Sequence, residues 1–302
     1  MRLCDLHCDT VTLRPDINDN GNQLSLDKGA VFDAWIQCFA AFIDDSDPHP
    51  EQTAEFIFDF ADSQFKKYGE RILPVETAAD IDRAISRRKC GVIITVENGA
   101  ALGGQIGNIQ RLYDRGVRLL TLTWNGENAL GFGAVTGSGA GLTAFGRDAV
   151  RKMERVGIIP DVSHLNTRGF YDVAELTEKP FVATHSNAFG VCNHPRNLTD
   201  EQLAELFERG GLVGINLYPL FITGGQSATF DDITRHVEHM LDLGGEHAVA
   251  LGGDFDGADM DGDVKSLADI PQLYEYLLGK LPESTVNELF FNNAYRFFKE
   301  NL

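Results

Sequence analysis

The sequence predicts an α/β protein in which residues 1–302 fold as a single (β/α)8 barrel of the TIM type. Three observations support this prediction. Short apolar runs recur along the chain, amphipathic stretches alternate with them over about 250 residues, and polar side chains follow the ends of the runs. The length of 302 residues allows one large domain, and 43% hydrophobic residues suffice for a full core without disulfide bonds.

The apolar runs are predicted to be the strands of the barrel. Most of them are apolar throughout rather than alternating, which is typical of parallel strands that are covered on both faces. The eight predicted strands are residues 2–7, 34–43, 91–97, 117–123, 157–164, 181–185, 212–217 and 248–254.

The amphipathic stretches between and after these runs are predicted to be helices. Thr199, with Gln202 three residues later, has the arrangement of a capping box. Thr143 is placed to cap another helix in the same way, and Gly157 to end it. The predicted helices are residues 51–68, 78–88, 106–115, 143–156, 167–176, 200–209, 230–243, 266–278 and 283–300.

An open, doubly wound sheet is the alternative fold. The glycine pattern argues against it, because no G-x-G-x-x-G follows the first predicted strand. The glycine-rich segments 103–107 and 136–141 do not stand between a strand and a helix either, so neither is interpreted as a phosphate-binding loop.

Charge and cysteine content limit the partners and the compartment. With 45 acidic and 26 basic residues the formal charge is −19, which repels phosphate backbones and anionic bilayers, so neither nucleic acid nor membrane is an expected partner. The first ten residues do not have the pattern of a signal peptide, and no run approaches the ~18 apolar residues of a membrane span. The five cysteines contain no C-x-x-C pair, and we expect reduced thiols in a cytoplasmic protein.

Metal-competent side chains end or follow five of the eight predicted strands. In a barrel the carboxyl ends of all strands open on one face, so residues distant in sequence converge there. Each residue alone has an ordinary structural explanation as a core histidine or a helix cap, but the set as a whole predicts a metal site. Its members are His7, Asp9, Glu97, His164, His185 and Asp254.

The spacing of these residues predicts two metal ions. His7 and Asp9 point to the same side of an extended chain, whereas Cys8 points away. His164 and His185 come from consecutive strands and could share a second ion, with Glu97 as the bridge between the two. Imidazole and carboxylate ligands suit zinc, and also manganese or cobalt. Two such ions with two carboxylates keep enough positive charge to hold a bridging hydroxide and to polarise a carbonyl.

Two further residues are assigned roles around the metals. Asp254 is placed to shuttle a proton, with Asp256 as its competitor. Arg196 follows the sixth predicted strand, where a guanidinium can hold a substrate carboxylate through two hydrogen bonds; the alternative is an ordinary surface arginine.

The remaining histidines are expected to have lesser roles. His236 and His239 are expected on a solvated or half-buried helix face, and His49 and His247 in structural or solvated positions. His194 is close enough to Arg196 in sequence to line the site.

Several sequence motifs of the chain resemble those of a known family. The chain is similar to the membrane dipeptidase (renal dipeptidase) family of zinc metallopeptidases, in an intracellular bacterial-type form. The matching segments are DLHCDT, TVENG, LTLTWN, GLTAFGRDAVRKMERVGIIPDVSH, ATHSNA, HPRNLTDEQL, INLYP and LGGDFDG, and FNNAYRFF resembles the C-terminal helix of the family.

The resemblance implies a barrel with metal-dependent hydrolase architecture, a binuclear zinc centre and hydrolysis of dipeptides. It assigns the first ion to His7 and Asp9, the bridge to Glu97 and the second ion to His164 and His185. It also makes Asp254 the proton shuttle and Arg196 the group that binds the free carboxylate of the dipeptide. Members are often homodimers, so a homodimer is an expectation as well.

The sequence departs from the family at one substrate-contacting position. Many members have a histidine in L-T-H after the fourth strand, where this chain has Trp124. Tyr218 is expected in the pocket wall. Two other functions stay open from the sequence: a barrel metallohydrolase that acts on another small amide or lactone, and a non-catalytic metal-binding homologue.

Overall fold

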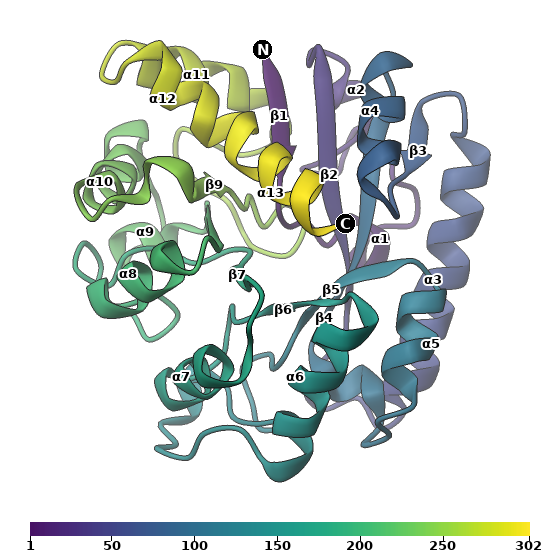
Figure 1. The fold of residues 1–302 in the computed structure, drawn as a ribbon. Helices are drawn as coiled ribbons and strands as arrows, with labels where there is room; N and C mark the ends of the chain where they lie inside the picture. The colour runs from purple at the N-terminus through teal and green to yellow at the C-terminus, as the bar shows by residue number, and fades with distance from the viewer.

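The computed structural model describes residues 1–302 and shows a closed barrel of parallel strands surrounded by helices (Figure 1). Eight strands close into the ring β1-β2-β4-β5-β6-β7-β8-β9, with β9 pairing back to β1. The predicted (β/α)8 barrel is therefore confirmed. The strands are β1 (Arg2–Asp5), β2 (Ala34–Phe42), β3 (Ile72–Pro74), β4 (Cys90–Glu97), β5 (Val117–Thr121), β6 (Ile159–Asp161), β7 (Val182–Ala183), β8 (Leu212–Ile215) and β9 (Val249–Leu251).

Strand β3 is additional to the ring and was not predicted. Its three residues pair with the start of β4, from Ile72 opposite Cys90 to Pro74 opposite Val92. From Ile94 onward, β5 pairs with β4 in place of β3. An apolar stretch this short gives too weak a pattern to be distinguished from a loop in the sequence.

Eight of the nine predicted helices are present as single helices. The structure has α3 (Pro50–Lys67), α4 (Ala78–Ser86), α5 (Asn108–Asp114), α6 (Ala144–Val156), α7 (Thr167–Leu176), α8 (Asp200–Glu208), α10 (Phe230–Asp242) and α11 (Ile270–Leu278). Thr199 and Gln202 form the predicted capping box of α8. The Thr143 side chain accepts from the backbone of Gly146 at the start of α6, and Gly157 ends that helix at φ 100°.

Other helical segments differ from the prediction. The single helix expected over 283–300 consists of α12 (Glu283–Asn287), a π-turn η5 (Glu288–Asn292) and α13 (Asn293–Asn301). The short segments that were not predicted are α1 (Thr10–Leu13), α2 (Leu26–Gly29), α9 (Pro219–Thr223), η1 (Gly99–Leu102), η2 (Ala134–Thr136) and η3 (Gly245–His247); η4 (Leu267–Asp269) precedes α11. None of the helices has both the length and the apolar composition needed to cross a membrane.

The C-terminal helical segments pack against the amino ends of β1 and β9 (Figure 1). The side chain of Asn293 donates to the carbonyl of Val249, and the guanidinium of Arg2 donates to Asn292. Buried Phe291 and Phe298 pack below the barrel with apolar side chains of the strands. The core is thus covered at this end, and the carboxyl ends of the strands are left to form a site.

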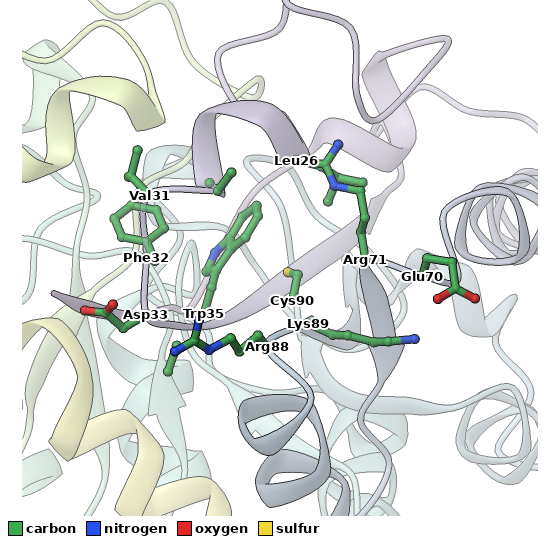
Figure 2. A pocket seen from close by; sticks show the side chains of 13 residues that line it. Leu26, Val31, Phe32, Asp33, Trp35, Glu70, Arg71, Arg88, Lys89 and Cys90 are labelled. Atoms are coloured by element: carbon green, nitrogen blue, oxygen red, sulfur yellow. The ribbon is translucent and has the colours of Figure 1, made fainter.

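A surface cavity of about 300 Å³ lies beside the amino ends of β2 and β4 (Figure 2). Trp35 and Cys90 come from the strands, and Arg71, Arg88 and Lys89 lie around the cavity. In Figure 2 Arg71 and Lys89 extend in different directions rather than toward one point.

Candidate metal centre

The six residues predicted for the metal site lie together at the carboxyl end of the barrel. His7 and Asp9 follow β1, Glu97 is the last residue of β4, His164 and His185 follow β6 and β7, and Asp254 follows β9. Five of them are buried, and the Asp254 side chain keeps 14% of its surface exposed.

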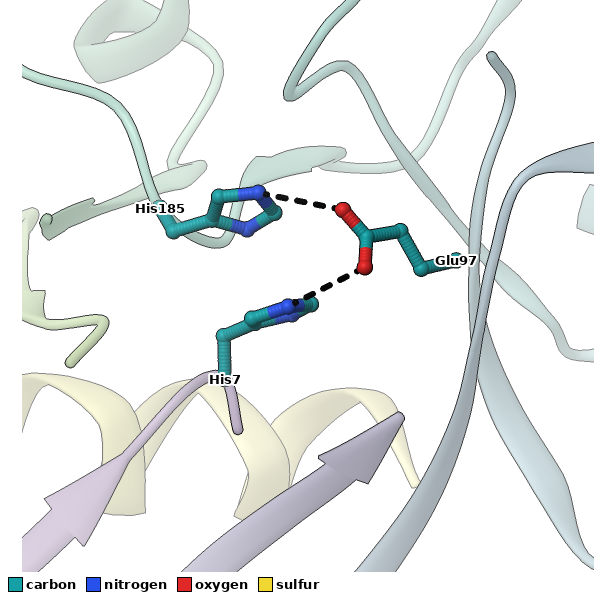
Figure 3. A group of neighbouring side chains, drawn as sticks. All are labelled: His7, Glu97 and His185. Carbon is teal, nitrogen blue, oxygen red and sulfur yellow. Dashed lines mark ion pairs between the residues drawn. The ribbon is translucent and has the colours of Figure 1, made fainter. Parts of the chain in front are cut away.

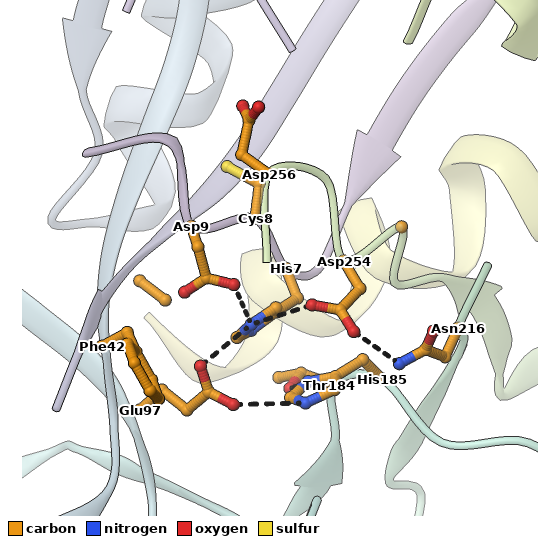
Figure 4. A network of polar contacts seen from close by, with 12 residues as sticks. His7, Cys8, Asp9, Phe42, Glu97, Thr184, His185, Asn216, Asp254 and Asp256 are labelled. Carbon is orange, nitrogen blue, oxygen red and sulfur yellow. Dashed lines mark hydrogen bonds and ion pairs between the residues drawn. The ribbon is translucent and has the colours of Figure 1, made fainter. Parts of the chain in front are cut away.

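Glu97 lies between two groups of these side chains, because its two oxygens face different partners. Oε2 is 3.5 Å from Nε2 of His7, and Oε1 is 3.6 Å from Nε2 of His185 (Figure 3). Oε1 is also 2.9 Å from Nε2 of His164. Around His7, Nε2 is 3.3 Å from Oδ2 of Asp9 and 3.9 Å from Oδ1 of Asp254 (Figure 4).

The hydrogen-bonding atoms of this cluster are suited to a cation. Nε2 of His164 and Nε2 of His185 are only 2.9 Å apart, and both face the same carboxylate oxygen of Glu97. Nδ1 of His164 is 3.1 Å from the amide oxygen of Asn125, which can only accept, so Nδ1 carries the proton and Nε2 a lone pair. A divalent ion would offset the repulsion between such electron-rich atoms.

Two buried atoms of the cluster also lack hydrogen-bond partners, namely Nε2 of His7 and Oδ1 of Asp9. Unpartnered buried polar atoms are uncommon in native proteins and need a ligand or another explanation. Three-residue groups with ligand atoms within 4.8 Å of one another are His7–Glu97–His185 and His7–Asp9–Asp254. The donor set of imidazoles and carboxylates therefore fits zinc-type divalent ions.

Burial shapes the electrostatics of the cluster. Burial, together with the negative charge of Glu97, raises the pKa of Asp9 to about 8. Burial lowers the pKa of His164 well below its usual value, and the Arg196 guanidinium adds to this effect. Burial, followed by the charge of His7, also lowers the pKa of His185. Neutral imidazoles, the form in which histidine binds metals, are thus favoured at His164 and His185. At His7 burial acts in the same direction, but the carboxylates of Asp9 and Glu97 outweigh it and raise the pKa well above its usual value.

The backbone around the cluster is strained. Outside glycine, positive φ angles occur at Asn98 (88°), His164 (68°), Asp254 (61°) and Asp256 (66°), all in the segments that follow strands β4, β6 and β9. The left-handed conformation costs an L-residue about 1–2 kcal/mol, and such strain concentrates at functional sites. The fifth such residue, Arg88, lies at the other end of the barrel.

The structure distinguishes Asp254 from its competitor Asp256. The Asp256 carboxylate accepts hydrogen bonds from Thr10, from Arg14 and from the backbone of Gln23, so it holds the segment after β1 in place. One oxygen of Asp254 accepts from the Asn216 side chain at 2.9 Å, and the other faces His7 (Figure 4). Of these two aspartates, only Asp254 thus has an oxygen directed at the cluster.

Arg196 is buried rather than on the surface, with 3% of its area exposed. Its Nη2 donates to the carbonyl of His185 at 3.4 Å, and its guanidinium lies 5.2 Å from the ring centre of Phe221. Its Nε has no partner, and burial lowers its pKa to about 10. Arg196 and His164 line a cavity of about 610 Å³. His194 lies beside Arg196, whose backbone N–H donates to its ring, but does not line this cavity.

A second cavity, of about 310 Å³, opens onto the cluster from another side. Asp9, Glu97 and Asp254 line it together with Trp124 and Tyr218. Three large apolar side chains of its lining were not predicted from the sequence, and these are Leu13, Phe42 and Phe221.

An aromatic wall borders this cavity. Trp124 packs edge-to-face on Phe42 with ring centres 4.9 Å apart, and it is 6.3 Å from His164. Phe42 is the last residue of β2, so its strand-end position was the signal that could have identified it.

Cys8 and two helical histidines lie outside the cluster. Cys8 points away from the metal-competent groups, and its thiol donates to the carbonyl of Cys38. The expectation of a solvated or half-buried face is wrong for His236, which is fully buried between the backbone N–H of Ala188 and the carbonyl of Ile222. The neighbouring His239 is 29% exposed and pairs with Asp200.

Comparisons with known proteins give one consistent result. The sequence model of the membrane dipeptidase family (peptidase family M19) matches residues 1–301. A Klebsiella pneumoniae protein, described as an uncharacterized protein in the pqqA 5' region, is 34% identical over 235 residues, which cover 74% of this chain and 86% of that protein. An uncharacterized dipeptidase of Schizosaccharomyces pombe is 36% identical over 201 residues, which cover 65% of this chain and 48% of the relative. The chain thus spans about half the length of that relative.

Solved structures share the fold over the whole chain. A metallopeptidase of Rhodobacter sphaeroides, liganded with a phosphinate mimic of the dipeptide L-Ala-D-Ala, has a TM-score of 0.92 and 26% identity, covering 100% of this chain and 99% of its own. A family M19 metallopeptidase, dipeptidase AC, has a TM-score of 0.91 and 29% identity, covering 100% of this chain and 98% of its own.

Proposed function

Because this chain belongs to the membrane dipeptidase family of metallopeptidases (peptidase family M19), we propose that it hydrolyses dipeptides at the buried cluster centred on Glu97. The observation that carries the proposal is the position of Glu97, whose two oxygens face His7 on one side and the pair His164 and His185 on the other.

This arrangement supports a binuclear centre with Glu97 as the bridge. His7 and Asp9 would hold one divalent ion, and His164 and His185 the other, with zinc as the preferred metal. When bound, the two ions would supply Lewis acidity that polarises the scissile carbonyl and acidifies an attacking water.

Asp254 would take up and deliver the proton. One of its oxygens faces the cluster, and Asn216 holds the other at 2.9 Å, so the carboxylate is oriented and still partly open to water. A group in this position can accept the proton of the attacking water and pass it to the leaving amine.

Arg196 would recognise the free carboxylate of the dipeptide. Its guanidinium is buried beside the cluster, lines the cavity shared with His164 and has an unpartnered Nε. A charged fork of this kind binds a carboxylate through paired hydrogen bonds. The dipeptide mimic bound by the Rhodobacter sphaeroides relative supports small dipeptides as substrates, including those with a D-residue in second place.

Trp124 and Tyr218 would form part of the pocket wall, where they line the smaller cavity with Phe42. We also propose a cytoplasmic location, which is supported by five free, buried thiols. The homodimer stays a prediction, and light scattering on the purified protein would test it.

Metal analysis coupled to a dipeptide panel tests the proposed function. Purified protein should carry close to two divalent ions per chain, lose hydrolysis after chelation and regain it when zinc returns. The panel should pair each dipeptide with its C-terminal amide and its D-isomer at the second residue. Carefully metal-loaded protein without stoichiometric metal, or with metal but no cleavage of any dipeptide, would contradict the proposal.

A further inference from the structure

A chain of three buried side chains runs from β6 to the candidate metal ligand His185. The Thr184 hydroxyl is 2.8 Å from Nδ1 of His185 and 2.6 Å from Oδ2 of Asp161. All three residues have 1% of their surface exposed. Figure 4 shows Thr184 together with His185, next to His7 and Asp254.

The Asp161 carboxylate has its capacity as an acceptor filled. Its Oδ1 accepts from the backbone N–H groups of Ser163 and Thr184, both at 3.0 Å. Its Oδ2 lies 2.5 Å from the hydroxyl of Thr121 and 2.6 Å from that of Thr184. These contacts match the roughly four acceptor positions of an ionised carboxylate, so the proton of the Thr184 hydroxyl points at Asp161.

This direction determines the proton position on His185. A hydroxyl has one proton, and Thr184 uses it on Asp161, so it can only accept toward Nδ1 of His185. Nδ1 therefore carries the proton and Nε2 the lone pair. That Nε2 is the atom that faces Nε2 of His164 at 2.9 Å and Oε1 of Glu97 at 3.6 Å.

We propose that Asp161 and Thr184 are positioning residues that lock His185 in the Nδ1–H tautomer and aim its lone pair into the metal centre. The effect on metal binding rests on the proposed metal centre, whereas the tautomer follows from the hydrogen bonds alone. His164 has only the half-buried Asn125 in the corresponding place, whereas the partners of His185 are bound into the ends of three strands. Of these two histidines, His185 is thus the one whose ring is held more firmly by hydrogen bonds.

Nitrogen chemical shifts of the imidazoles in metal-free protein at mildly alkaline pH test the tautomer directly. The His185 signals should show a protonated Nδ1 and an unprotonated Nε2 in the wild type. In Thr184→Val, which removes the acceptor but keeps the shape, the signals should move toward a mixture of tautomers, and Thr184→Ser should restore the wild-type pattern. A wild-type His185 with its proton on Nε2 would overturn the proposal, whether or not any variant folds.

Metal affinity tests the consequence. Loss of a partner that orients a ligand typically weakens metal binding about 10- to 100-fold, so Thr184→Val should lose one of the two ions in competition with a chelator at a concentration that leaves the other bound. Thr184→Ser should keep both ions. Thr234→Val is the matched control, because Thr234 is also buried and donates its hydroxyl to a carbonyl, that of Phe230, away from the cluster.

Equal affinities for both ions in Thr184→Val and wild type would overturn the positioning role. If wild-type protein binds no metal at all, the proposed centre fails. The tautomer measurement still decides whether Asp161 and Thr184 hold the proton of His185 on Nδ1.

Discussion

The two ends of the barrel carry cavities of almost the same size and of different chemistry. The cavity at the carboxyl ends of the strands measures about 310 Å³ and the one at the amino ends about 300 Å³. The first is lined by buried carboxylates, with unpartnered atoms on Asp9 and on adjacent His7. At the second, Arg71 pairs with Asp27 and the N-terminal amine with Asp33, in exposed ion pairs. These two cavities therefore differ in chemistry rather than in size, and the larger cavity of about 610 Å³, lined by Arg196 and His164, also lies at the carboxyl end.

A single strand connects the two ends and shows the same contrast. Strand β4 starts at Cys90, beside the amino-end cavity, and ends at Glu97, between the candidate ligands. A left-handed residue stands near each of its ends, Arg88 before it and Asn98 after it. Asn98 uses its side chain to bond the backbone of Ile43 and Ala100, which shapes the loop behind Glu97. Strain is thus part of the site at one end and part of an ordinary helix terminus at the other.

The strongest test of this contrast substitutes a glutamate at each end. Glu97→Gln should remove most of the bound metal and lower kcat/KM by about 10³-fold or more, beyond the ~10²–10³ typical of one lost oxyanion donor. The matched Glu70→Gln at the amino-end cavity should leave metal content and kinetics unchanged. Elemental analysis and dipeptide kinetics on both variants measure the difference. Similar losses in the two variants would break the distinction between the ends.

A pair of arginine variants gives the next largest expected effect. Arg196→Met should cost about 2–3 kcal/mol of substrate recognition, or roughly 30- to 150-fold in kcat/KM on a dipeptide, because a charge-assisted contact to its carboxylate is lost. The corresponding Arg71→Met at the amino end should retain wild-type kinetics. C-terminally amidated dipeptides should be poor substrates of the wild type. If wild-type protein cleaves a dipeptide and its amide at equal rates, Arg196 does not bind the carboxylate.

Trp124→His sharpens the contrast within the carboxyl end. An indole has one neutral N–H donor and no acceptor, whereas a histidine can also become charged, so the variant should turn over faster by up to about 10²-fold and accept more polar dipeptides. The contact with Phe42 makes the present wall apolar, which favours apolar substrates. Kinetics on a panel of dipeptides, with Trp124→Phe as the control that keeps an aromatic ring, measure the shift. Unchanged turnover and substrate order in Trp124→His would place this residue outside the chemistry.

The sequence predicted the barrel and the positions of the polar strand ends, because both depend on local patterns. The predicted lengths of the strands that lead to the site were too great. The run 181–185 contains only the two-residue strand β7, since the backbone N–H groups of Thr184 and His185 bond to side chains of Asp161 and Ser163 rather than to a neighbouring strand. Such hydrogen bonds join residues about 22 positions apart and leave no periodic signal. The left-handed conformation of His164, at φ 68°, likewise leaves no periodic signal in the sequence.

The smallest expected effect concerns Arg88, the strained residue that belongs to the amino end. It follows α4 at φ 52°, where its N–H bonds to the carbonyl of Ile85 and the N–H of Lys89 bonds to that of Ala84. This is the Schellman arrangement, in which glycine is the usual residue at the left-handed position. Relief of about 1–2 kcal/mol of strain in Arg88→Gly outweighs the ~0.5–1 kcal/mol entropic cost of glycine.

Arg88→Gly should therefore raise the free energy of unfolding by about 0.5–1 kcal/mol, a shift of about 1–2 °C in Tm, with unchanged dipeptide kinetics. The control is Arg87→Gly one residue earlier, which should lower Tm because Arg87 has φ −91° and no strain to relieve. His164→Gly would relieve similar strain at the carboxyl end but should abolish activity, since its side chain faces Glu97. A lower Tm in Arg88→Gly would mean that the Arg88 side chain stabilises the amino end by more than its strained backbone costs.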